Sequence, residues 1–103
     1  MKSKRTKATD ISPQVRASVK NRDKWCIFCG RHGTDCCHLI PRSSGGLGIV
    51  QNLVLACRQC HVNMDFTKSR LLMLTHARKH LDKHYPNFED KDRVFKKWSP
   101  IDD

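Results

Sequence analysis

The spacing of apolar positions near the start of the chain predicts an amphipathic helix. Ser12 can cap a helix whose first residue is Pro13, because a proline lacks only an N–H that would be unpaired there. Val15 and Val19 then lie on one helical face, four residues apart. We therefore expect a helix over about residues 13–22.

Two short apolar runs further along the chain predict strands. The runs cover residues 36–40 and 53–55, and the glycine-containing stretch 41–50 between them is typical of a loop. From His61 the spacing becomes helical and continues to about residue 85, with a break near 67–68. The order predicted is helix, strand, loop, strand and a helical region.

These elements divide the chain into three parts. Residues 1–11 are polar and basic and predict a flexible basic arm. Residues 12–86 hold all the predicted strands and long helices and form one domain. Residues 87–103 are a polar C-terminal tail, which we expect to pack through Phe95 and Trp98.

Composition shows that this domain has little material for a core. The chain has 103 residues, of which 38% are apolar, and a core of that size often needs a covalent or metal staple. Its 20 lysines and arginines exceed its 10 acidic residues, giving a net charge of +10. Such a charge favours binding to nucleic acid phosphates, although it also fits a solvated surface with a basic bias.

The cellular compartment decides how six cysteines are used. Residues 1–7 are basic with no apolar run, so no signal peptide is expected, and no stretch has the length of a membrane span. We expect a cytoplasmic protein without a membrane partner. Because thiols stay reduced there, metal binding is favoured over disulfides.

Four of the cysteines have the spacing of a structural zinc site. Two Cys-x-x-Cys motifs, Cys26/Cys29 and Cys57/Cys60, are separated by 27 residues, 30–56. Each motif can turn two sulfurs toward one ion, and four thiolates make a closed tetrahedral zinc site. A redox motif or disulfides are the alternatives, but two redox motifs in one short unit are not expected. Cys36 and Cys37 are left over, and small buried residues are one interpretation of them.

The residues between the motifs carry a family resemblance. They read Cys37-His38-Leu39-Ile40-Pro41-Arg42-Ser43, then Gly45-Gly46, then Asn52-Leu53-Val54, then Cys60-His61. The segment from about Trp25 to Asp65 resembles HNH nucleases, the ββα-metal class, and in particular the small HNH proteins of bacteriophages and prophages. The resemblance implies a small α+β fold, in which a zinc site of four cysteines staples a ββα-metal core between N- and C-terminal helices.

The same resemblance implies roles for three residues. His38 takes the place of the general base, Asn52 that of a residue that braces the loop or touches the metal, and His61 that of a metal ligand. The chemistry agrees, because a histidine can accept a proton at neutral pH and a divalent ion can stabilise a leaving oxygen. Either histidine alone could also be a surface or packing residue.

Cys37 and Asp65 leave the ligands of the catalytic ion open. Cys37 stands where many family members have an aspartate or histidine ligand, and a thiolate there would favour zinc. Otherwise the ion depends on His61, Asn52 or Asp65. Asp65 lies four residues after His61, on the same helical face, and its carboxylate suits magnesium or manganese. It could equally be an exposed helix residue.

Basic residues near these positions are candidates for DNA contacts. Arg42 can hold a phosphate with two hydrogen bonds, and Lys68 and Arg70 can follow the backbone. As alternatives, each could be solvated. Such contacts position DNA without reading its sequence, so little sequence preference is expected.

Two functions compete on this evidence. The first is a metal-dependent HNH endonuclease that hydrolyses DNA with Mg²⁺, Mn²⁺ or Ni²⁺. Its resemblance to phage proteins implies a phage or prophage origin and action in DNA packaging, beside terminase and packaging proteins. The second is a non-catalytic zinc module that binds nucleic acid or a protein, which Cys37 at a usual ligand position favours.

Overall fold

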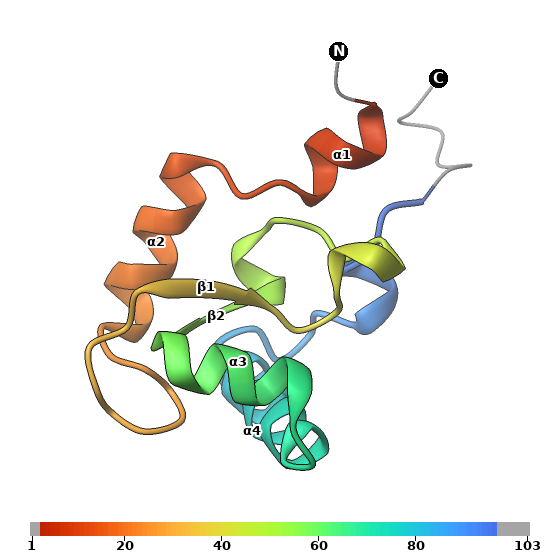
Figure 1. Cartoon of the computed structure of the whole chain (residues 1–103). Coiled ribbons are helices and arrows are strands. Elements are labelled where there is room, and N and C mark those ends of the chain that lie inside the picture. The colour runs from red at the N-terminus through yellow and green to blue at the C-terminus, as the bar shows by residue number, and fades with distance from the viewer. Residues whose placement is uncertain (1–2, 97–103) are drawn as a thin grey trace.

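The computed structural model describes residues 3–96 and shows a small α+β fold around a two-stranded sheet (Figure 1). Strands β1 (Asp35–His38) and β2 (Leu53–Ala56) are antiparallel, with Asp35 opposite Ala56 and His38 opposite Leu53. Within the described residues, no helix is long and apolar enough to cross a membrane. The helices are α1 (Lys4–Thr9), α2 (Pro13–Asp23), α3 (Arg58–Phe66) and α4 (Arg70–His84).

Local sequence signals account for the helix boundaries. In α2, Ser12 accepts a hydrogen bond from the Val15 N–H and Pro13 is the first residue, which confirms the predicted helix start. The helix ends before Lys24, which has a positive φ of 66°. α3 and α4 are separate helices, as the break near residues 67–68 predicted.

The two faces of the sheet are buried in two different clusters. Because side chains alternate along a strand, Cys37 and Val54 face one way while Cys36 and Leu55 face the other. The first face packs against α3 and α4, through Met64, Ala77 and Leu81 among others. The second face packs against α2, chiefly through Val19. Both strands therefore lie inside the molecule.

The ends of β1 and β2 differ slightly from the sequence prediction. β1 ends at His38, and Leu39 and Ile40 turn out of the strand because both bond to Asn52. The connection to β2 contains two short 3₁₀ turns, Arg42–Ser44 and Val50–Asn52. His38 therefore stands at the exit of the strand.

Both terminal segments contact the loop between the strands. Residues 4–9 form helix α1, within the segment for which the sequence predicts a flexible arm. At the other end, a 3₁₀ turn (Asp90–Asp92) precedes Arg93, whose side chain is 1% exposed and donates to the Gln51 carbonyl. Phe95 is half-buried and its N–H bonds to Gly45, whereas Trp98 lies outside the described residues.

Candidate active site and metal centre

The four cysteines of the two motifs converge on one point. Their sulfurs all lie within 4.8 Å of one another, and Cys29 Sγ is 3.7 Å from Cys57 Sγ. Zinc–sulfur bonds of about 2.3 Å would place tetrahedral sulfurs about 3.8 Å apart. All four thiols are free, so the cluster is not a pair of disulfides. The donor set and its spacing fit a structural zinc ion.

Local turns create this arrangement. Gly30, with φ 76°, allows a tight turn after the first motif, in which its N–H bonds to the Cys26 carbonyl. In the second motif, Cys57 caps α3 and its sulfur accepts from the Cys60 N–H. Burial opposes a charged Cys26, but hydrogen bonds from the backbone N–H groups of Cys57, Cys29 and Phe28 lower its pKa to about 7. The thiolate form of Cys26, which is the form that binds a metal, is thus favoured.

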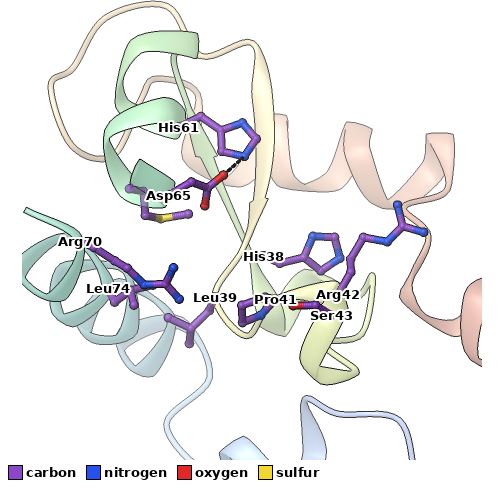
Figure 2. Close-up of a pocket in the computed structure, with 10 residues that line it drawn as sticks. His38, Leu39, Pro41, Arg42, Ser43, His61, Asp65, Arg70 and Leu74 are labelled. Carbon is purple, nitrogen blue, oxygen red and sulfur yellow. Dashed lines mark ion pairs between the residues drawn. The ribbon is translucent and has the colours of Figure 1, made fainter. Parts of the chain in front are cut away.

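A separate cleft of about 240 Å³ lies between the exit of β1 and helices α3 and α4 (Figure 2). Its apolar walls include Leu39, Met64 and Leu74. Its polar lining residues come from three segments: the end of β1 and the loop after it (His38, Arg42 and Ser43), α3 (His61 and Asp65) and α4 (Arg70). Two histidines, one carboxylate and two arginines therefore share one cavity.

His38 is held in one tautomer by a backbone hydrogen bond. Its Nε2 lies 3.0 Å from the Thr9 carbonyl oxygen, which can only accept, so Nε2 carries the proton and Nδ1 the lone pair. Burial lowers the pKa of His38 below its ordinary value; the Thr9 hydrogen bond opposes this shift, and the charge of Arg42 adds to it. A neutral imidazole with a free lone pair is suited to accept a proton.

His61 is oriented by a residue that sequence reasoning missed. Asp35 accepts a hydrogen bond from His61 Nδ1 at 2.8 Å, and its Oδ2 is 3.3 Å from Arg58 Nε. Burial opposes ionisation of Asp35, but the hydrogen bonds from His61 and Thr34 and the Arg58 charge lower its pKa. The lone pair of His61 is therefore on Nε2, which is 3.5 Å from Asp65 Oδ2.

Carboxylate–histidine pairs of this kind commonly orient metal ligands. Figure 2 shows His61 and Asp65 projecting from α3 next to each other. Because Asp65 is in the fourth position after His61, both groups can hold one divalent ion. No local pattern pointed to Asp35, because it lies 26 residues from its partner.

Asn52 and Cys37 lie away from the cleft lining. Asn52 is fully buried: its oxygen accepts from the Ile40 N–H at 3.0 Å, and its amide donates to the Ile40 and Leu47 carbonyls. This side chain braces the loop after β1. Cys37 is 1% exposed in the core, and burial raises the pKa of its thiol well above the usual range. A neutral thiol in the core is a poor metal ligand.

Comparison with known proteins identifies this segment. A family model described as HNH endonuclease matches residues 26–65. This segment is therefore similar to HNH endonucleases. The match begins at Cys26 and ends at Asp65, so it contains both cysteine motifs and the cleft residues of β1 and α3. A search of curated proteins found no match to the chain. HNH domains generally belong to nucleases that use divalent metal ions and act on DNA.

The predicted DNA-binding residues differ in their surroundings. Arg42, which lines the cleft, forms an ion pair with Asp10. Arg70 enters the cleft from the first turn of α4. Lys68 is exposed in the α3–α4 connection and is not among the lining residues. Two of the three predicted cations thus reach the cleft.

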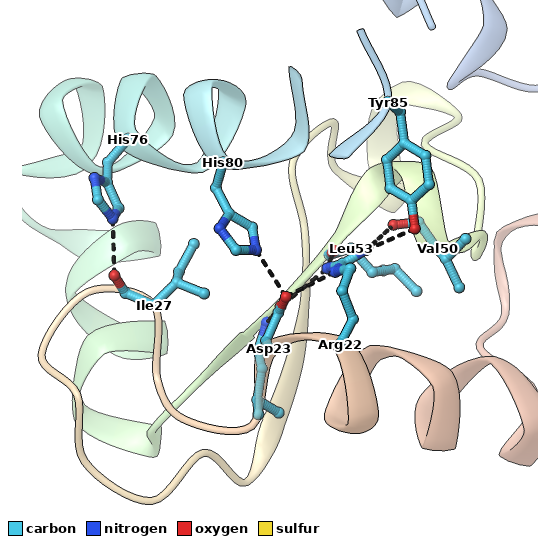
Figure 3. A network of polar contacts seen from close by, with 9 residues as sticks. Arg22, Asp23, Ile27, Val50, Leu53, His76, His80 and Tyr85 are labelled. Atoms are coloured by element: carbon cyan, nitrogen blue, oxygen red, sulfur yellow. Dashed lines mark hydrogen bonds and ion pairs between the residues drawn. The ribbon is translucent and has the colours of Figure 1, made fainter. Parts of the chain in front are cut away.

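A second group of residues that could hold a metal lies outside the matched segment, where α2 meets α4. It comprises Asp23, His80 and His84, and Figure 3 shows the contact between Asp23 and His80. Asp23 Oδ1 accepts from Arg22 Nε and His80 Nε2, both at 2.7 Å. Its Oδ2 accepts from Arg22 Nη2 and the Leu55 N–H, both at 2.9 Å. These four bonds use all four lone-pair positions of the carboxylate, so we interpret the group as a structural network.

All the side-chain N–H donors of Arg22 also have hydrogen-bond partners. Its five N–H donors reach Asp23 twice, the Val50 and Leu53 carbonyls, and the Tyr85 hydroxyl. The network therefore joins α2 to β2 and to α4. The sequence did not reveal it, because the partners of Arg22 and Asp23 in or next to β2 and α4 are 28 to 63 positions away.

For the zinc cluster, we expect folded protein to contain about one tightly bound zinc ion per chain. Cys29→Ser should weaken zinc affinity by more than the roughly 10- to 100-fold that loss of an outer-shell partner costs. Cys36→Ala, which removes a sulfur outside the cluster, should retain the ion. Metal analysis after competition with a chelator measures both. Folded parent protein without bound zinc would contradict the assignment.

For the Arg22–Asp23 network, Asp23→Asn should lower the free energy of unfolding by about 3–5 kcal/mol, because it leaves a buried guanidinium unbalanced. Glu89→Gln, in the exposed Glu89–Lys91 pair, is the control and should change it by less than about 1 kcal/mol. Urea titration of zinc-loaded protein measures both values. Equal effects of the two variants would show that the network is not a stabilising centre.

The pH dependence of that stability has a definite sign. Burial alone would raise the pKa of Asp23, but its bonds to Arg22 and His80 hold the pKa well below the usual range. A carboxyl with a depressed pKa stabilises the fold above its unfolded pKa of about 3.9 and loses that contribution only as the pH falls below it. The contribution of Asp23 to the free energy of unfolding should therefore be complete between about pH 5 and pH 7, which is roughly one unit or more above the unfolded pKa. Urea titrations of the parent protein over this range and below it measure the loss.

Proposed function

We propose that the chain is a metal-dependent endonuclease that hydrolyses phosphodiester bonds in DNA. The observation that carries this proposal is the shared cleft, in which His38 faces the His61–Asp65 pair across a cavity flanked by Arg42 and Arg70. Hydrolysis of a phosphodiester needs a base, a site for a divalent cation and cationic groups for the phosphate. Residues suited to all three tasks line this cleft.

We assign His38 as the general base that takes a proton from the attacking water. Its Nδ1 lone pair is available because Nε2 is bonded to the Thr9 carbonyl. Its lowered pKa keeps it neutral at physiological pH, so most molecules have the base in its active form. Asn52 acts indirectly, by bracing the loop that follows His38.

We assign His61 Nε2 and Asp65 as the residues that hold the catalytic divalent ion. When bound, such an ion supplies charge stabilisation to the scissile phosphate and the leaving 3′ oxygen. Asp35 fixes the orientation of His61, whose imidazole suits Ni²⁺, and the carboxylate of Asp65 suits Mg²⁺ or Mn²⁺. Cys37, in the core, is left out of this assignment.

Arg42 and Arg70 are suited to bind phosphates at the two sides of the cleft, and the exposed Lys68 extends this cationic surface. The net charge of +10 favours the same partner. A role in phage DNA packaging, beside terminase, stays a prediction from the resemblance alone.

The central test measures cleavage of supercoiled plasmid with Mg²⁺, Mn²⁺ or Ni²⁺. His38→Ala should lower the rate by about 100- to 10,000-fold, the usual contribution of general base catalysis. His32→Ala, which removes an exposed histidine away from the cleft, should cut like the parent. An unchanged rate in His38→Ala would refute the base assignment. If zinc-loaded parent protein binds DNA but cuts with none of the ions, the chain is a binding module.

A pair of variants separates the candidate ligands. Asp65→Asn should raise the metal concentration for half-maximal cleavage by about tenfold or more, because a carboxylate ligand becomes neutral. Cys37→Ala should leave that concentration unchanged, because its thiol is buried in the core. Cleavage titrated against Mn²⁺ measures both. The opposite pattern would make Cys37 the ligand and Asp65 an exposed helix residue.

A further inference from the structure

The residues just before α2 make an unexpected contact with the active site. We call residues 3–10, which comprise helix α1 and its flanking residues, the N-terminal arm. The last carbonyls of a helix have no partner within it. At the end of α1, the Thr9 carbonyl instead accepts from His38 Nε2 at 3.0 Å, across 29 positions of sequence. The hydrogen bond that sets the form of the base thus comes from the arm.

A glycine in the loop between the strands accommodates the arm. The Gly48 N–H donates to the Ala8 carbonyl at 2.9 Å. A Cβ at Gly48 would lie 2.0 Å from the Asp10 carbonyl oxygen and 3.0 Å from that of Thr9. Gly48 has no positive φ, so only the close approach of the arm requires a glycine there.

Two side-chain contacts hold the arm from the other side. Arg5 Nη2 donates to the carbonyls of Ser43, at 2.9 Å, and Arg42, at 3.3 Å. Asp10 forms an ion pair with the Arg42 side chain. The arm therefore contacts the loop on both sides of the point where it reaches His38, which restrains the Thr9 carbonyl.

We propose that the N-terminal arm is a positioning element of the active site, in which the Thr9 carbonyl fixes the tautomer and ring orientation of His38. This inference rests on the proposed role of His38 as the base. Without an acceptor on Nε2, an imidazole exchanges between two neutral tautomers and can rotate, so its lone pair would point at the substrate only part of the time. The arm is far from His38 in sequence but adjacent to it in the fold.

The test displaces the arm without altering its sequence. In Gly48→Ala, the new methyl group must push the Thr9–Asp10 backbone away from the loop. We expect side-chain ¹H–¹⁵N correlation spectra of His38 to change from a single Nε2–H tautomer to a mixture of two. At saturating DNA, kcat should fall by roughly tenfold to a hundredfold with a smaller change in KM, as for other losses of base alignment. Ala77→Gly, a substitution in α4, is the control for general destabilisation and should keep the single tautomer.

A second variant covers the case in which Gly48→Ala does not fold. Arg5→Ala combined with Asp10→Asn removes the two side-chain contacts, and Arg5 is exposed and Asp10 half-buried, so the core is untouched. It should also give a mixed tautomer. If either folded variant keeps His38 wholly in the Nε2–H form, the inference is wrong. The tautomer is read without cleavage, so a parent protein that fails to cut would overturn the nuclease proposal while the spectra still decide the role of the arm.

Discussion

The buried pair of Arg22 and Asp23 joins the parts of this small fold. Its hydrogen bonds reach the backbone of β2, the turn before it and the second half of α4, so three elements share one charged centre. Removing two charges from water is costly, and such a pair is tolerated only when every donor and acceptor is satisfied. Here five donors and four acceptor positions all have partners. Asn52 lies between Val50 and Leu53, whose carbonyls Arg22 binds. Its side chain in turn bonds Ile40 and Leu47, at the two ends of the loop that follows His38.

The cysteine cluster lies just beyond the end of β2. It joins the turn after α2 to the start of α3, two segments whose apolar residues alone form a small core. Metal binding can supply folding energy that such a core lacks. Since α3 begins at the second cysteine motif, the cluster also sets where His61 and Asp65 emerge from the helix. The Arg22–Asp23 pair and the cysteine cluster thus both join segments that flank β2, and the cleft lies at the exit of β1.

Much of this arrangement was predictable because its signals are local in the sequence. Ser12 and Pro13 act within one turn, and two cysteines of one motif share a turn, so spacing alone indicates their roles. What was missed depends on contacts across many positions: Asp35 with His61 across 26, Asp23 with His80 across 57. The contact between Thr9 and His38 could not be predicted for another reason: it uses a backbone carbonyl, which every residue type has. For residues 1–11 the polar composition predicted a flexible arm, whereas the structure has α1 there, packed on the loop.

The two histidines of the cleft show how one side chain can serve two purposes. Each has one ring nitrogen occupied by a hydrogen-bond acceptor and therefore presents the lone pair of the other. For His38 the acceptor is an uncharged carbonyl, and burial keeps the ring neutral by lowering its pKa, which suits a base that must gain and release a proton. For His61 the acceptor is the carboxylate of Asp35, whose negative charge would strengthen the ring in its proposed role as a metal ligand. The sequence motif predicts the positions of both histidines. The hydrogen-bond partners of His38 Nε2 and His61 Nδ1, which come from the N-terminal arm and from β1, determine which chemistry each ring is suited to.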